Sequence, residues 1–179
     1  MRCFLAIGCP DEVKDELVKA QEELLDFGRM KAVEYENLHL TLKFLGDIED
    51  IEPVTRALER VGHSRFAVTV KGLGAFPSRN RPRVLWAGVE KGSAEVSELH
   101  GRLEEALEPL GFSRDGKFHP HITLARVREV KDSIGLKTAL ENQRDAAFGE
   151  YEVGDFTLME SRLSPGGPEY SRVREYRLK

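Results

Sequence analysis

The pattern His-x-Thr-x occurs twice in the sequence, at residues 39–42 and again at residues 121–124. Each copy lies in an apolar run that is typical of a β-strand. Because side chains alternate between the two faces of a strand, the His and Thr of each copy should point the same way, about 7 Å apart. Two imidazoles and two hydroxyls could therefore converge on one small polar group. A phosphate that is attacked from one side and loses its leaving group on the other fits this arrangement.

Hydrolysis of a cyclic phosphodiester needs a base to activate water, an acid for the departing oxygen and donors for the phosphoryl oxygens. His39 and His121 suit the first two roles because the pKa of imidazole lies near neutrality. Thr41 and Thr123 could hold the non-bridging oxygens, where charge grows in the transition state. This scheme requires no metal and no cofactor, and it predicts a bell-shaped dependence of rate on pH.

A single His-x-Thr copy would more often be structural than functional. Only five histidines occur in the chain, and two of them fall on the repeated pattern, which favours a shared site. By the same alternation, Leu40, Leu42 and Phe44 are expected to pack in the core behind the first copy, and Lys43 to share the histidine face. An alternative is a metal site in which His119 joins the two motif histidines as a ligand.

The expected elements follow the same order in both halves of the chain. The first half reads as strand 2–8, helix 11–27, motif strand 38–45, helix 51–61 and strands 65–75 and 83–89. The second half reads as helix 93–110, motif strand 121–127, helix 132–142 and strands 151–161 and 171–178. Asp11 is expected to cap its helix and Gly28 to end it. The repeat predicts an α+β, bilobal duplicated fold, with two antiparallel sheets flanked by helices around a central cleft. Residues 1–179 would form a single domain of two pseudo-symmetric lobes.

The composition excludes some classes of protein. The net charge of −4 argues against binding nucleic acid over a broad basic surface, so phosphate recognition should be local. Cys3 and Cys9 lie too far apart on a strand to pair, which favours a reducing, cytoplasmic setting. No stretch approaches the roughly 20 apolar residues of a membrane span. Since two lobes already enclose one cleft, a monomer is expected.

With these motifs, the sequence resembles the 2H phosphoesterases, and among them the RNA 2′,3′-cyclic phosphodiesterases, also described as 2′-5′ RNA ligase-like proteins. The resemblance covers nearly the whole chain. It rests on residues 2–7, 39–46, 74–77, 83–89 and 119–126 and on the ending near residues 163–165.

The resemblance implies that His39 donates a proton to the leaving 3′ oxygen and that His121 accepts one from water, giving a 2′-phosphomonoester. It also implies that Phe44 stacks on the terminal base and that Arg126 contacts the phosphate. The substrates would be RNAs with cyclic phosphate ends, including tRNA fragments. A regular strand places Phe44 and Arg126 on the wrong face, so either each strand ends or bulges there, or the two side chains reach in from the rim.

Three other functions remain open at this stage. The same groups could run the reaction backwards and join a cyclic end to a 5′-hydroxyl. The chain could instead be an RNA-end or nucleotide-binding module with little catalysis, or a metal hydrolase using His39, His119 and His121. Arg79, Arg81 and Arg83 form a basic loop that could follow an RNA backbone or simply be solvated.

Overall fold

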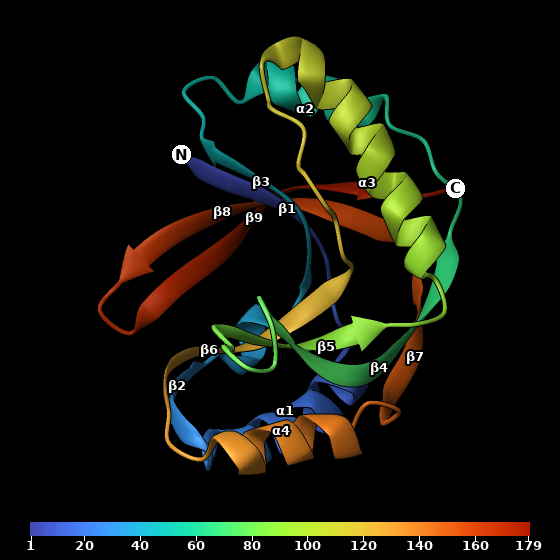
Figure 1. Ribbon diagram of the computed structural model, residues 1–179. Helices are drawn as coiled ribbons and strands as arrows, with labels where there is room; N and C mark the ends of the chain where they lie inside the picture. Colours follow the sequence, from blue (N-terminus) through green and yellow to red (C-terminus); the bar gives the residue numbers. More distant parts are fainter.

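The computed structural model describes residues 1–179, which form nine strands, four α-helices and two short 3₁₀ turns (Figure 1). The strands are β1 (Arg2–Ile7), β2 (Gly28–Ala32), β3 (Leu40–Asp47), β4 (Phe66–Phe76), β5 (Val84–Val89), β6 (His121–Val130), β7 (Ala147–Val153), β8 (Asp155–Ser164) and β9 (Gly167–Arg177). The helices are α1 (Asp11–Leu25), α2 (Glu52–Glu59), α3 (Ser93–Leu107) and α4 (Ser133–Asn142), and the 3₁₀ turns are Tyr35–Asn37 and Glu108–Leu110.

All nine strands belong to one antiparallel sheet, in the order β7-β4-β5-β6-β3-β1-β8-β9, with β2 paired to β6. The mixed, antiparallel character of the fold was predicted correctly, but the expectation of two separate sheets was wrong. The two motif strands, β3 and β6, join the halves of the sheet through a single pair, Leu40 with Ile122. Leu40 and Ile122 are the second residues of the two His-x-Thr motifs, so the link between the halves is also the centre of the motif region.

Each half of the chain contributes strands to the other side of this link. After the first motif strand the chain passes through α2 into β4, which pairs with β5. After the second it passes through α4 and β7 into β8, which pairs with β1. Helices α1 and α4 cover the outer face of the part of the sheet that holds β4 to β7, whereas α2 and α3 cover the part that holds β1, β3, β8 and β9 (Figure 1).

The helices are held by apolar stripes that the sequence spacing already indicated. In α1, Val13, Leu17, Ala20 and Leu24 are buried at intervals of three or four residues. They join a core cluster of 36 buried residues that runs beneath both parts of the sheet. The core therefore packs against the face of the sheet that the helices cover, and the opposite face of β3 and β6 is free to carry polar side chains.

The ends of two elements differ from expectation. Pro10, not Asp11, precedes α1, and no side chain caps the helix. Gly28 begins β2 instead of ending the helix, which stops at Leu25. The strands β2 and β7 were not predicted, because their sequences carry few apolar residues and their pairing partners are distant in sequence. No helix combines the length and the apolar character needed to cross a membrane.

Candidate active site

The two motifs face each other across the Leu40–Ile122 pair. Both of these residues are fully buried on the core face, so the His and Thr residues on either side point to the other face. The two strands are antiparallel. On one side of the Leu40–Ile122 pair His39 therefore lies beside Thr123, and on the other side Thr41 lies beside His121. The register therefore gathers the two histidines and two threonines into one small area, related by a local twofold arrangement.

A bulge follows each motif at the same position. The pairing of β3 with β1 skips Leu42, and the pairing of β6 with β5 skips Leu124, each the fourth residue of its motif. An extra residue reverses the alternation of faces beyond it. Phe44 and Arg126, each five residues after a motif histidine, therefore return to the histidine face.

The bulge corrects two expectations about β3. Phe44 is not a core residue, because 69% of its surface is exposed, although Leu40 and Leu42 are buried as expected. Lys43 turns away from the histidines into the core, where its side chain is only 2% exposed. The single skipped residue explains both changes.

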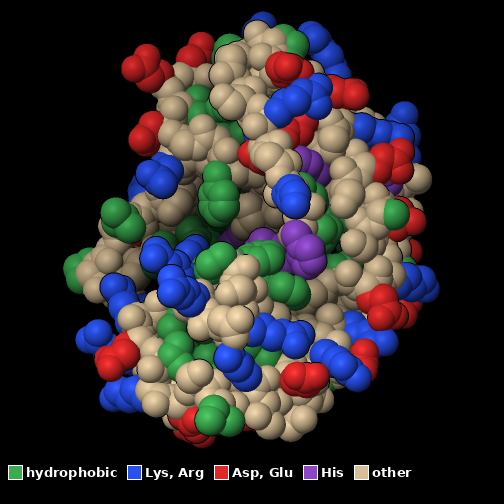
Figure 2. Space-filling model, viewed as in Figure 1, with side chains coloured by type: hydrophobic (Ala, Val, Ile, Leu, Met, Phe, Trp, Pro, Cys, Tyr) green, Lys and Arg blue, Asp and Glu red, His purple; other side chains and the backbone are tan.

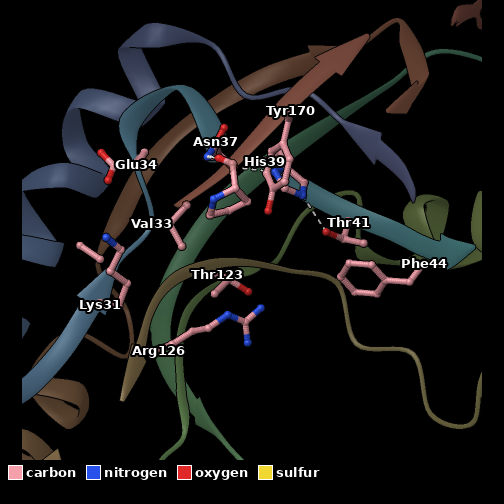
Figure 3. A pocket seen from close by; sticks show the side chains of 12 residues that line it. Lys31, Val33, Glu34, Asn37, His39, Thr41, Phe44, Thr123, Arg126 and Tyr170 are labelled. Carbon is pink, nitrogen blue, oxygen red and sulfur yellow. Dashed lines mark hydrogen bonds between the residues drawn. The ribbon is translucent and has the colours of Figure 1, made fainter. Parts of the chain in front are cut away.

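A pocket of about 160 Å³ opens over the motif strands. Of the residues predicted for the site, it is lined by His39, Thr41, Phe44, Thr123 and Arg126 (Figure 3). His121 does not line this pocket; it lies at its margin, beside Thr41 by the register of the strands. Figure 2 shows a hollow near the centre of this face, with histidine side chains beside it.

Both motif histidines are held by the same hydrogen bond. Nδ1 of His39 lies 2.6 Å from the carbonyl oxygen of Asn37, and Nδ1 of His121 lies 2.6 Å from that of His119. A carbonyl oxygen only accepts, so Nδ1 carries a hydrogen in each ring and Nε2 is the atom that gains or loses a proton. In neutral His39, Nε2 accepts a hydrogen bond from the Thr41 hydroxyl at 2.8 Å (Figure 3).

Burial lowers the pKa of both histidines below its usual value near 6.5. For His39 the bond to Asn37 opposes this effect, and the positive charges of Lys14 and His121 add to it. For His121 the carbonyl of His119 opposes the effect of burial, and the His119 ring adds to it. In the free protein both rings are therefore biased toward the neutral form.

Each histidine is packed by aromatic rings that the sequence did not single out. The His39 ring stacks on Phe4 at 5.1 Å between centroids and meets Tyr170 edge-on at 5.5 Å. The His121 ring meets Phe76 edge-on at 5.0 Å and lies 6.2 Å from Trp86. No sequence pattern could have identified these neighbours, since β9 and β5 reach the motif strands only through the folded sheet.

Behind the pocket, Lys43 lies at the centre of a buried ionic cluster. Its ammonium group lies 2.9 Å from a Glu104 oxygen, 3.1 Å from Asp115 and 2.8 Å from the carbonyl of Ser113. His100 completes the cluster through a 2.8 Å contact with Asp115. Burial would raise the pKa of Asp115, but the hydrogen bonds from His100 and Lys43 outweigh it and lower that pKa. The cluster thereby ties the motif strand β3 to the loop that leads into His121.

This cluster also bears on the metal hypothesis. His100, Glu104 and Asp115 are the potential ligands whose donor atoms lie within 4.8 Å of one another, and the Lys43 ammonium group already forms ion pairs with both carboxylates. His39, His119 and His121 do not form such a group. The three rings therefore do not have the close arrangement of donor atoms that a shared coordination shell requires.

A helix-flanked antiparallel sheet with two facing His-x-Thr motifs defines the class of the 2H phosphoesterases. A sequence profile of the 2′-5′ RNA ligase superfamily matches residues 9–164, and the chain belongs to this family.

The chain is also similar to individual proteins over its full length. It is 36% identical over 177 residues to an RNA 2′,3′-cyclic phosphodiesterase of Methanocaldococcus jannaschii, covering 98% of this chain and 100% of the relative. Among solved structures, TT0787 of Thermus thermophilus superposes with a TM-score of 0.83 at 31% identity, covering 99% and 97% of the two chains. LigT of E. coli, crystallised with 3′-AMP, superposes with a TM-score of 0.79 at 27% identity, covering 99% and 98%.

Proposed function

We propose that this protein hydrolyses 2′,3′-cyclic phosphodiester ends of RNA to 2′-phosphomonoesters, without a metal. The observation that carries the proposal is the pair of histidines, each with Nδ1 bound to a carbonyl oxygen two residues earlier and Nε2 left as the titrating atom. The names of full-length relatives, RNA 2′,3′-cyclic phosphodiesterases, support the choice of substrate.

In the proposed reaction, Nε2 of neutral His121 takes a proton from a water molecule as its oxygen attacks phosphorus. The bond from phosphorus to the 3′ oxygen breaks, and Nε2 of protonated His39 gives that oxygen a proton. Thr41, Thr123 and Arg126 would bind the non-bridging oxygens, and Phe44 would stack on the terminal base. An RNA 5′-hydroxyl in place of water would give a 2′-5′ linkage with the same proton transfers.

We further propose that the chain is one domain of two pseudo-symmetric, duplicated lobes and works as a monomer on cyclic RNA ends such as those of tRNA fragments. The matched bulges and matched histidine hydrogen bonds support the duplication. Cys3 and Cys9 are free thiols, and burial raises the pKa of Cys9 to about 12, which suits a reducing cytoplasm.

The function is tested by incubating an RNA oligomer ending in a 2′,3′-cyclic phosphate with the protein, with and without EDTA. We expect turnover to a 2′-phosphate that EDTA leaves unchanged, because the proton transfers use side chains alone. Hydrolysis is detected as the gain in mass of one water molecule, and the 2′-phosphate is distinguished from its 3′-isomer by chromatography against standards of both monoesters. Lack of turnover would favour the nucleotide-binding module, and loss of turnover in EDTA would favour a metal hydrolase.

The lowered histidine pKa values predict where activity should fall on the pH scale. His39 must be protonated to act as the acid, and burial lowers its pKa in the free protein, so the alkaline limb of kcat/KM should lie below the usual imidazole pKa of about 6.5. A bound phosphate anion favours imidazolium, so the alkaline limb of kcat should lie at higher pH than that of kcat/KM. Parallel profiles of the two constants would contradict this assignment.

A further inference from the structure

Five arginines beside the pocket form no ion pair with any carboxylate. They are Arg79, Arg81 and Arg83 in the β4–β5 loop and Arg126 and Arg128 on β6. All five are exposed. By contrast, 13 of the 27 Lys and Arg side chains lie within 4.0 Å of a carboxylate oxygen. In a chain of net charge −4, this local surplus of free positive charge stands out. We call the five residues the arginine track.

The track is continuous with the catalytic pocket. Arg126 lines that pocket and pairs in register with Lys31 of β2, which lines it too. On its other side Arg126 pairs with Val84, the residue after Arg83. The amide of Val127 donates a 2.8 Å hydrogen bond to the carbonyl of Arg83, which holds the loop against β6.

Beyond Arg126 the track lines a second depression. Arg81 and Arg83 from the loop and Arg128 from β6 surround it, with Pro82 buried between the two loop arginines. The one carboxylate on its rim is Glu129, which lies 3.9 Å from Arg29. Figure 2 shows Lys and Arg side chains gathered beside the central hollow, on the side of β2 and β6. An anion leaving the pocket on this side meets one positive group after another.

We propose that the arginine track binds the phosphates of the RNA upstream of the cyclic end, so that the enzyme distinguishes an RNA chain from a free cyclic mononucleotide. The proposal rests on the proposed function. The pocket takes the terminal nucleotide, and the rest of the strand must leave through its mouth. Planar guanidinium groups along that exit suit phosphate oxygens, which fix the position of a strand without reading its sequence.

The test compares wild type with the triple variant Arg81→Ala, Arg83→Ala, Arg128→Ala on two substrates. One is a cyclic-ended RNA of about ten nucleotides, and the other is adenosine 2′,3′-cyclic phosphate. The slope to compare is that of log kcat/KM against log salt concentration, called the salt slope. If the three arginines contact three phosphates, the salt slope should change by about 0.7 for each contact. Between about 50 and 200 mM salt, kcat/KM of wild type for the oligomer should then fall about 20-fold more than that of the variant.

The mononucleotide keeps the two proposals separate. The triple variant should turn over the mononucleotide at the wild-type rate, because none of the three replaced side chains lines the catalytic pocket. A matched control, Arg60→Ala, Lys137→Ala, Arg177→Ala, removes three unpaired cations elsewhere and should leave the salt slope unchanged. The proposal is refuted if the triple variant keeps the wild-type salt slope on the oligomer, or if the control variant reduces that slope by as much as the triple variant does. If wild type turns over neither substrate, the proposed function itself fails.

Discussion

Replacing His121 by alanine should lower kcat for a 2′,3′-cyclic phosphate by about 10²- to 10⁴-fold, the usual contribution of a general acid or base. The reason is that Nε2 of His121 is the free atom of a ring fixed by the bond to the His119 carbonyl. A loss of similar size is expected for His39→Ala. Single-turnover rates on the cyclic substrate measure the chemical step directly.

The adjacent histidine provides the matched control for this pair. His119 is exposed, its backbone carbonyl holds His121 and would remain in His119→Ala, and its ring lies 6.4 Å from the His121 ring between centroids, so His119→Ala should stay within a few-fold of wild type. The metal hypothesis predicts the opposite, because it uses all three rings as ligands. A large loss in His119→Ala that added zinc restores would overturn the proton-transfer scheme.

Replacing Lys43 by methionine should reduce the free energy of unfolding by about 3–5 kcal/mol, because it leaves buried Glu104 without its counter-charge. Both side chains are at most 4% exposed, so water cannot compensate. For a chain of this length the midpoint of thermal unfolding should fall by about 10 °C. Calorimetry or circular dichroism measures the change.

Two further variants distinguish a buried charge from a general effect of the substitution. Adding Glu104→Gln to Lys43→Met removes the unpaired charge and should recover part of the loss. Lys19 forms an ion pair with Glu16 at the same 2.9 Å distance but on the exposed surface of α1, so Lys19→Met should leave the midpoint near that of wild type. Equal losses in the two lysine variants would argue against the buried cluster.

The parts of this protein that follow from local patterns could be predicted from its sequence. Alternation of apolar residues predicted both motif strands, and spacing predicted all four helices. The residues with the wrong expected face, Phe44 and Lys43, lie beyond a bulge. A bulge depends on how β3 pairs with β1, and strand pairing is not encoded in the alternation of one strand. Only the expected roles of Phe44 and Arg126 hinted that the strands are irregular there.

The partners of the site depend even more on distant parts of the chain. Tyr170 meets His39 from β9, 131 residues further along the chain, and Trp86 approaches His121 from β5. The cluster around Lys43 joins β3 to residues of α3 and of the loop after it. Ion pairs of this kind have no spacing rule, because the fold alone brings their members together.

The crossing of strands between the halves has a consequence for how the protein is made. β1 pairs on one side with β3 but on the other with β8, which is synthesised only after β2 to β7. During synthesis the outer edge of this apolar first strand therefore stays open until residues 155–164 exist. Unpaired edges of this kind attract other chains. The nascent protein is thus vulnerable to aggregation at this edge until β8 is synthesised, and the hairpin of β8 with β9 then covers the edge.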